Sequence, residues 1–296
     1  MSYQFIVSLI AVYLSTVILC VSSVNLRIDE FEERECYGTT VGFGYSGTLE
    51  FHYQNLKKRY TGCTYIHGNL ELTNLVDPKL NYDLSFLKTI RYVSGYVLIG
   101  LVTEVEIIPL DSLQVIRGNQ TYRIMDDDYS LVVGLTSRND DSSWGLKEIH
   151  LPQLKEISNG KVLFLGNPFL GYINTIDWEP ILRGRQDAAH FQDGPYNESV
   201  ANNKDTTLCE GGRRWGDSKA LCQQADPRKS GPCHADCNGR CFGPESSQCC
   251  HNSCAVGCDG PSDDQCWMCK DYQYEAHCVG FCPHKSYPKL QDCIQY

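Results

Sequence analysis

A short apolar pattern recurs between residues 36 and 203 of this chain. Each copy has two apolar or cysteine residues three positions apart, followed within five residues by a glycine and then by a β-rich run. The four copies are Cys63-x-x-Ile66, Leu87-x-x-Ile90, Leu113-x-x-Ile116 and Leu154-x-x-Ile157. The runs that follow them are 70–75, 96–102, 121–124 with 131–135, and 162–165. Such a repeat predicts a stack of similar coils.

The repeat spacing favours a solenoid. The first two spacings are 24 and 26 residues, and the third is 41, which leaves room for a polar surface insertion at 126–143. One coil cannot bury its own apolar face, so stacked parallel strands must share a core. Glycines would supply the tight corners between strands, namely Gly68, Gly95, Gly118 and Gly160. We therefore expect a mainly β fold, a right-handed β-helix or solenoid, over residues 24–183. An ordinary β-sandwich is the alternative.

The second region is rich in cysteine. Fourteen of the 17 cysteines lie at or after Cys209, beyond a polar linker that we place at 184–208. Four of them are spaced four, four and eight residues apart, and the next four repeat this spacing at once: Cys233, Cys237, Cys241 and Cys249, then Cys250, Cys254, Cys258 and Cys266. Other residues recur at the same offset, His234, Gly243, Pro244 and Gln248 as His251, Gly260, Pro261 and Gln265. A 17-residue module has been duplicated.

Disulfides would replace a hydrophobic core in residues 209–296. Four cysteines allow three pairings, and a one-to-three, two-to-four arrangement would cross-link each module most compactly. Cys269 with Cys278, and Cys282 with Cys293, would then close simpler loops. Each bridge would contribute about 2–4 kcal/mol by restricting the unfolded chain. The expected product is a disulfide-rich rod.

The amino terminus indicates export. Residues 1–23 contain no Lys, Arg, Asp or Glu, and 5–21 are nearly all apolar. They are typical of a secretory signal peptide, with an uncleaved membrane anchor as the alternative. Cleavage would remove Cys20 and leave 16 cysteines, an even number that suits an oxidising compartment. Sequons at Asn119 and Asn197 are potential glycosylation sites in the same compartment.

The remaining chemistry argues against an enzyme. The net charge of −10 makes nucleic acid an unsuitable partner. Gly42-x-Gly44-x-x-Gly47 matches a phosphate-binding glycine fingerprint, but no convincing strand precedes it and no partner motif follows it, so we interpret it as a flexible segment. Oxidised cysteines can serve neither as zinc ligands nor as nucleophiles. The acidic run 126–128 lacks the ligand spacing of a calcium loop. We expect no catalytic residue, cofactor or metal.

Two tryptophans need a pocket because their indoles are large and lie in or near the disulfide-rich part of the chain. Trp215 lies within the cysteine-rich region and Trp178 lies just before the linker. We expect Trp215 to pack into the last coil of the solenoid. A partly exposed position is the alternative.

Taken together, these features resemble the epidermal growth factor receptor (ErbB) family from Cys36 to Cys293. Three motifs resemble its first ligand-binding L domain: Asn81-Tyr-Asp-Leu-Ser-Phe-Leu-Lys-Thr-Ile90, Ile116-Arg-Gly-Asn119 and Gly145-Leu-Lys-Glu148. Cys249-Cys-His-Asn-x-Cys254 resembles its furin-like cysteine-rich domain. The insulin receptor family shares both domain types, but the first motif favours the ErbB branch. The resemblance implies that Cys36 pairs with Cys63. It also implies that Cys209 and Cys222 form a first module that has fewer cysteines than usual.

The resemblance also implies a ligand site on the sheet face of the L domain and its amino-terminal segment. The corresponding residues are Phe43, Tyr45, Gly47, Asn74 and Leu101. Arg123 aligns, less securely, where an acidic residue contacts ligand in the family, and this charge reversal puts the usual ligand preference in doubt.

Other positions depart from the family pattern. Gly171 stands where a cysteine closes the L domain, and only ten residues separate Cys282 from Cys293, where the family carries its dimerisation arm. We therefore expect a monomer. The resemblance favours a secreted decoy or modulator that binds an epidermal-growth-factor-like ligand or a receptor ectodomain. The alternatives are a fragment of a receptor tyrosine kinase at the plasma membrane and a structural extracellular protein.

Overall fold

The computed structural model describes residues 34–138, 144–183, 185–192, 208–224 and 233–296. The expected signal peptide and Asn197 lie outside these ranges. None of the helices within the described ranges is long and apolar enough to cross a bilayer.

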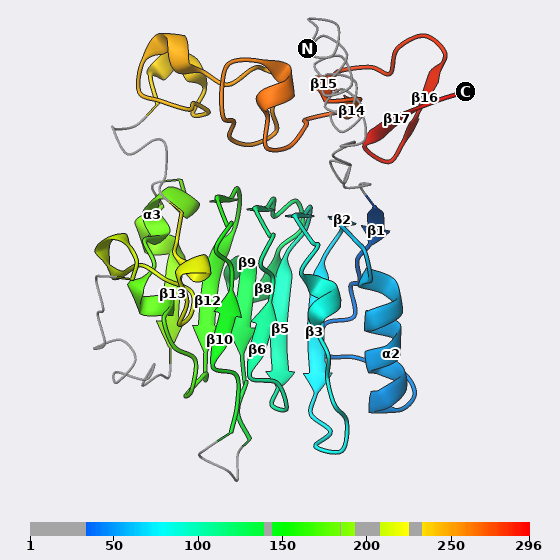
Figure 1. Cartoon of the computed structure of the whole chain (residues 1–296), viewed down its shortest axis with the longest axis vertical. Helices are drawn as coiled ribbons and strands as arrows, with labels where there is room; N and C mark the ends of the chain where they lie inside the picture. The colour runs from blue at the N-terminus through cyan, green and yellow to red at the C-terminus, as the bar shows by residue number, and fades with distance from the viewer. Residues whose placement is uncertain (1–33, 139–143, 184, 193–207, 225–232) are drawn as a thin grey trace, which may run out of the picture. The chain divides into compact units, whose positions relative to one another are not determined.

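The first region, up to residue 192, consists of short strands with few helices (Figure 1). Its elements are β1 (Glu35–Tyr37), α2 (Leu49–Tyr60), β2 (Tyr65–His67), β3 (Leu70–Leu75), η1 (Ser85–Leu87), β4 (Tyr92–Val93), β5 (Val97–Val102), β6 (Ile107–Pro109), β7 (Val115–Ile116), β8 (Tyr122–Ile124), β9 (Asp127–Gly134), β10 (Glu148–His150), β11 (Glu156–Ile157), β12 (Lys161–Leu165), η2 (Ile173–Thr175), α3 (Trp178–Ile181), η3 (Gln186–Ala188) and β13 (Ala189–Gln192). The η elements are 3₁₀ helices.

These strands form a β-solenoid. One parallel sheet has the order β1-β2-β4-β7-β11, a second has the order β3-β5-β9-β12-β13, and β6 pairs with β10. From β2 to β12 the chain passes repeatedly between the first two sheets, and each coil adds one strand to each of these two sheets. The mainly β solenoid expected from the repeat is therefore confirmed.

The strand register corrects one copy of the repeat. Ile66, Val93, Ile116 and Ile157 occupy equivalent positions in the first sheet. The second copy is therefore Ile90-x-x-Val93, three residues later than the Leu87-x-x-Ile90 pattern suggested. The pattern misled because Leu87, Ile90 and Val93 are all fully buried, and their spacing of three allows two alignments.

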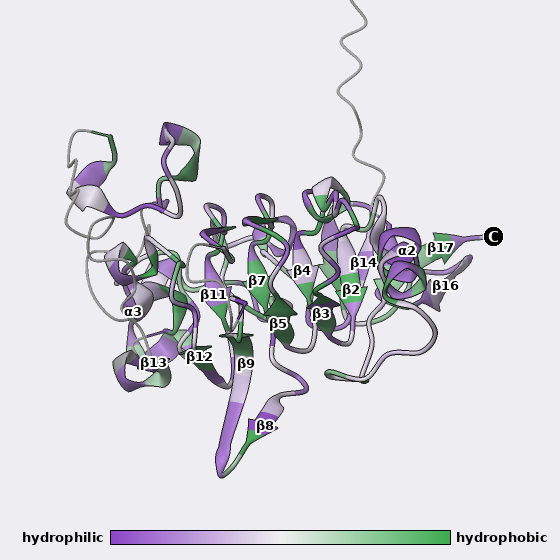
Figure 2. Cartoon of the chain, turned by 90° about the horizontal axis from the view of Figure 1, so that it is seen from below, coloured by the Kyte–Doolittle hydropathy of each residue, from purple (hydrophilic) through white to green (hydrophobic). Residues whose placement is uncertain are grey.

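The polar insertion is also different from the expectation. Residues 127–134 form β9, and the antiparallel pairing of Tyr122 with Tyr129 makes β8 and β9 a hairpin. Figure 2 shows this hairpin extending away from the second sheet. β8 is therefore no coil of the solenoid, and the acidic residues 126–128 form the hairpin's turn and the start of β9.

The corner glycines are required for two different reasons. Gly68, Gly118 and Gly160 have φ angles of 94°, 66° and 69°, in the left-handed region that glycine adopts without strain. Gly95 has no such angle, but a Cβ atom there would lie 1.9 Å from Oδ1 of Asn69.

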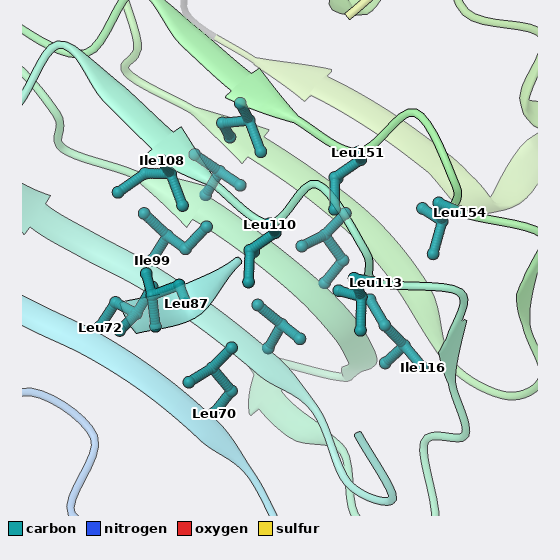
Figure 3. Close-up of a cluster of buried hydrophobic side chains, with 14 of the residues drawn as sticks. Leu70, Leu72, Leu87, Ile99, Ile108, Leu110, Leu113, Ile116, Leu151 and Leu154 are labelled. Carbon is teal, nitrogen blue, oxygen red and sulfur yellow. The ribbon is translucent and has the colours of Figure 1, made fainter. Parts of the chain in front are cut away.

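The core lies between the sheets. Figure 3 shows aliphatic side chains from successive coils meeting there, among them Leu72, Ile99 and Ile108. Each such side chain contributes about 1.5–3 kcal/mol when it is fully buried. Helix α2 adds its buried residues Tyr53 and Tyr60 to the same cluster.

The second region contains short elements joined by disulfides. Its elements are η4 (Glu210–Gly212), η5 (Lys219–Leu221), η6 (Ala235–Cys237), η7 (Ser246–Gln248), η8 (Asp263–Gln265), β14 (Tyr272–Tyr274), β15 (His277–Val279), β16 (Ser286–Lys289) and β17 (Asp292–Gln295). The disulfides of the chain are Cys36–Cys63, Cys209–Cys222, Cys233–Cys241, Cys237–Cys249, Cys250–Cys258, Cys254–Cys266, Cys269–Cys278 and Cys282–Cys293. Both duplicated modules thus have the one-to-three, two-to-four order.

Trp215 lies in the solenoid core. Its side chain is almost fully buried in the main cluster, and its ring meets that of Trp178 edge to face with centroids 5.6 Å apart. The first cysteine-rich module therefore contributes its tryptophan to the solenoid core.

Candidate ligand-binding face

Residues 39–47, which we call the amino-terminal segment, dock on the second sheet through a buried carboxylate. Glu71 of β3 accepts hydrogen bonds from the backbone N–H groups of Val41 and Gly42, both at 2.9 Å. The hydroxyl of Tyr96 donates a third bond to the same carboxylate at 2.6 Å. Burial and the Glu71 hydrogen bond raise the pKa of Tyr96, so its hydroxyl remains a donor. Three donors compensate for burying the charge.

Two further side chains of β3 hold the carbonyl groups of the segment. The hydroxyl of Thr73 donates to the carbonyl of Gly42 at 3.0 Å, and the amide of Asn74 donates to the carbonyl of Phe43 at 3.0 Å. The flexible segment expected from its glycines is therefore a fixed one. Because the N–H of Gly42 already binds Glu71, that group is not free to cradle a phosphate.

The ring of Phe43 covers a glycine of the sheet. A Cβ atom at Gly100 of β5 would lie 2.5 Å from Cε1 of Phe43, so the ring occupies the space that a side chain would need. Phe43 keeps 38% of its surface exposed. The segment thus presents a fixed, partly exposed aromatic ring over a buried part of the sheet.

One row of residues, buried except for Leu165, runs from this point across the sheet. Thr73, Gly100, Gly134 and Leu165 pair in register on β3, β5, β9 and β12. The residue after each of them has a positive φ angle, and these corner residues are Asn74 (58°), Leu101 (52°), Leu135 (57°) and Gly166 (65°). Asn74 and Leu101, two of the expected ligand residues, are therefore equivalent corners of neighbouring coils.

The same corner contains a residue that the sequence argument missed. Leu135 is 50% exposed and follows Gly134 as Leu101 follows Gly100. The sequence did contain a signal for this equivalence, because Gly100-Leu101-Val-Thr and Gly134-Leu135-Thr share a Gly-Leu pair followed closely by threonine. Glu71 and Thr73 were also missed, because their contacts with the amino-terminal segment depend on which face of β3 they occupy.

The other expected ligand residues lie around this centre. Tyr45 is about half exposed, and its ring centroid lies 5.4 Å from that of His52 on α2. Gly47 precedes Thr48, the N-cap of α2. Arg123 is exposed on β8, where its Nε donates to the carbonyl of Met125 at 3.4 Å. Phe43 and Asn74 are thus in direct contact, whereas Gly47 and Arg123 belong to separate elements.

The hairpin limits the face on one side. Tyr122 at its base lies against Gly42, since a Cβ atom there would be 3.7 Å from the Tyr122 hydroxyl. At the tip, Met125 is 92% exposed. Lys161 donates to Asp127 at 2.6 Å, and this bond lowers the pKa of the Asp127 carboxyl. Asn119, the sequon residue within the described ranges, is exposed at the corner that leads into the hairpin.

Two family models match the chain: the receptor L domain over residues 62–182 and the furin-like cysteine-rich region over residues 193–296. The chain is 38% identical over 252 residues to the epidermal growth factor receptor of Gallus gallus, which is 85% of this chain and 34% of that protein. It is 37% identical over 209 residues to the receptor tyrosine-protein kinase erbB-4 of Mus musculus, 71% of this chain and 13% of that protein.

A third relative is the epidermal growth factor receptor of Drosophila melanogaster, 35% identical over 250 residues, 84% of this chain and 16% of that protein. The chain thus spans about a third or less of these relatives. The two matched regions are ectodomain modules with extracellular topology, and no kinase domain is present in this chain. The chain belongs to the epidermal growth factor receptor family, of which it carries a receptor L domain and a furin-like cysteine-rich region.

Proposed function

We propose that this chain binds an epidermal-growth-factor-like ligand on the amino-terminal segment and on the corner residues Leu101 and Leu135, which follow Gly100 and Gly134. The observation that carries the proposal is the docking of Phe43. Asn74 binds its carbonyl group, and Glu71 and Thr73 hold the backbone of the two residues before it. An aromatic ring that is fixed before binding loses little conformational entropy when a partner packs on it. Several relatives are named as epidermal growth factor receptors, which indicates the class of ligand.

The proposal extends to a role as an extracellular decoy or modulator. The two matched regions carry a candidate ligand face, and acting on their own they would sequester ligand without producing a signal. A single L domain offers one site and forgoes the gain of about 10²- to 10⁴-fold that a second linked site provides. We therefore expect a dissociation constant on the order of 1 μM for a monomeric chain.

The test is surface plasmon resonance with the purified chain and a panel of epidermal-growth-factor-like ligands. Phe43→Ala should weaken binding by about 30-fold, as expected of a central aromatic contact. The matched control is Phe281→Ala, which removes a phenylalanine that is 89% exposed in the cysteine-rich region and should leave binding unchanged. Absence of binding up to concentrations well above micromolar, or equal effects of the two variants, would contradict the proposal.

Glu71→Ala separates the docking of the segment from the contact with ligand. Without the carboxylate, the amides of Val41 and Gly42 should exchange faster with deuterium in the free protein. The affinity for ligand should decrease in the same variant. If these amides stay protected, Glu71 does not hold the segment and the pre-organisation argument fails.

A second candidate function is favoured by the small share of the relatives that this chain spans, 13% to 34%. The same ectodomain would then act as the amino-terminal part of a receptor tyrosine kinase. Sequencing transcripts beyond the codon for Tyr296 distinguishes the two: a stop codon supports the decoy, and an open frame into a membrane span supports the receptor. Failure of both growth factors and receptor ectodomains to bind in pull-down would favour a structural extracellular protein.

A further inference from the structure

Three potential metal ligands meet in the cysteine-rich region, away from the ligand-binding face. Asp263 and Asp264 lie in η8 and His277 begins β15. One ligand atom from each of the three lies within 4.8 Å of the others. Nδ1 of His277 and Oδ1 of Asp263 are 2.8 Å apart. Among the described residues, this is the one group of three such side chains whose donors converge.

The backbone on both sides of the cluster is held covalently. Asp264 is two residues before Cys266, which is bonded to Cys254, and a capping box formed by Ser262 and Gln265 fixes the turn that carries the two aspartates. His277 is next to Cys278, which is bonded to Cys269. The three donors are therefore presented by a framework that does not have to fold around an ion.

The donor set indicates which ion fits. One imidazole nitrogen with two carboxylates suits zinc, whereas calcium and magnesium prefer oxygen ligands alone. Ligands of one tetrahedral zinc ion lie about 3.3 Å apart, given metal–ligand distances of 2.0–2.2 Å. Nδ1 of His277 and Oδ1 of Asp263 lie 2.8 Å apart in a hydrogen bond, so an ion would replace that bond and the two donors would separate by about 0.5 Å. The cysteines of this region are engaged in disulfides and play no part in this set.

We propose that Asp263, Asp264 and His277 form a zinc-binding site that clips the second duplicated module to the β14–β15 loop. Three protein ligands leave a coordination position for water. The ion would restrain the joint between two disulfide-bonded units without entering their cores, and this role is independent of the proposed ligand binding.

Other histidine and carboxylate groups of the chain each lack one feature that a zinc site requires. His150 contacts two carboxylates, but Asp111 faces Nδ1 and Glu148 faces Nε2, so their oxygens approach opposite sides of the ring. Among the described residues, His234 pairs with one carboxylate, that of Asp236, at 3.3 Å. In the first duplicated module, serines 246 and 247 stand where the second has Asp263 and Asp264, so this donor pair is specific to the second copy.

The experiment is isothermal titration of the purified, untagged chain with Zn²⁺ at neutral pH, together with cobalt(II) absorption. We expect one equivalent of Zn²⁺ to bind in the micromolar range and Co²⁺ to give the visible bands of a low-symmetry site. His277→Ala and Asp264→Asn should each weaken binding by at least about tenfold. The control His234→Ala removes a comparable exposed histidine and should leave the affinity unchanged.

Because the three side chains lie at the surface, these variants should fold, and circular dichroism before the titration verifies this. Zn²⁺ should also slow deuterium exchange of the β14–β15 amides in the wild type but not in His277→Ala. Absence of saturable zinc binding, or equal affinities of the wild type and His277→Ala, would overturn the proposal.

Discussion

The two regions of this protein are stabilised by different means. In the solenoid, aliphatic side chains from successive coils form one large core, and a single disulfide, Cys36–Cys63, lies within it. From Cys233 onward, six disulfides close loops of 8 to 12 residues, and one of the small clusters there consists mostly of the cysteines themselves, with Phe242 beside them. The first region depends on packing and the second on covalent bonds.

The difference determines where side chains are free to change. In the solenoid, a residue of the candidate ligand-binding face also packs against neighbouring residues of the sheet, as Phe43 packs on Gly100. In the duplicated modules, the disulfides and capping boxes hold the backbone whatever the intervening side chains are. η7 and η8 both keep a capping box although serines 246 and 247 in one correspond to Asp263 and Asp264 in the other. A bridged module can therefore change its surface chemistry without changing its fold.

The largest predicted effect comes from reducing the disulfides. Each bridge contributes about 2–4 kcal/mol, so the loss of six should unfold residues 233–296. The amides of β5 and β9 should remain protected under the same conditions, because the solenoid core does not depend on those bridges. Hydrogen–deuterium exchange with and without a phosphine reductant measures both. Simultaneous loss of protection in the two regions would show that the solenoid depends on disulfides, either its own Cys36–Cys63 bridge or those of the cysteine-rich modules.

Trp215→Ala tests one of the places where the two regions meet. The side chain comes from the module closed by Cys209–Cys222 but is buried in the solenoid core against Trp178. Its loss should cost about 3–5 kcal/mol of unfolding free energy, as for other buried tryptophans. The control is Trp144→Ala, since Trp144 is 36% exposed and should contribute little. Denaturant unfolding followed by circular dichroism compares them, and similar midpoints would contradict the interdomain packing.

The sequence predicted these two regions unequally. Cysteine spacing alone indicated the duplicated modules. Of the three possible pairings, the one-to-three, two-to-four order was preferred because it cross-links each module most compactly. The apolar repeat predicted a solenoid but placed one copy three residues early, since Leu87, Ile90 and Val93 are all buried. Helix α2 was not anticipated, although Thr48 as N-cap and Lys57 in the last turn are typical helix signals.

The candidate sites were harder to predict because they depend on contacts between distant residues. Glu71 binds Val41 across 30 positions, and nothing in the local sequence of either residue indicates this contact. His277 meets Asp263 across 14 positions and two disulfide-bonded units. The resemblance to a known family supplied Phe43 and Asn74, but not the carboxylate that holds the segment in place.

The smallest effect concerns a pair of glycines, one from each region. Gly95→Ala would place a Cβ atom 1.9 Å from Oδ1 of Asn69, a buried oxygen that already accepts the N–H of Tyr96. Neither Asn69 nor Tyr96 can move without opening the stacked coils. We therefore expect overpacking to lower the free energy of unfolding by about 1–3 kcal/mol. Gly280→Ala, in the cysteine-rich region, meets no heavy atom within 4 Å and should change stability by less than about 0.5 kcal/mol. Urea unfolding of both variants under oxidising conditions measures the contrast. Equal losses would mean that the disulfide-bonded region is as closely packed as the solenoid, against the distinction drawn between them.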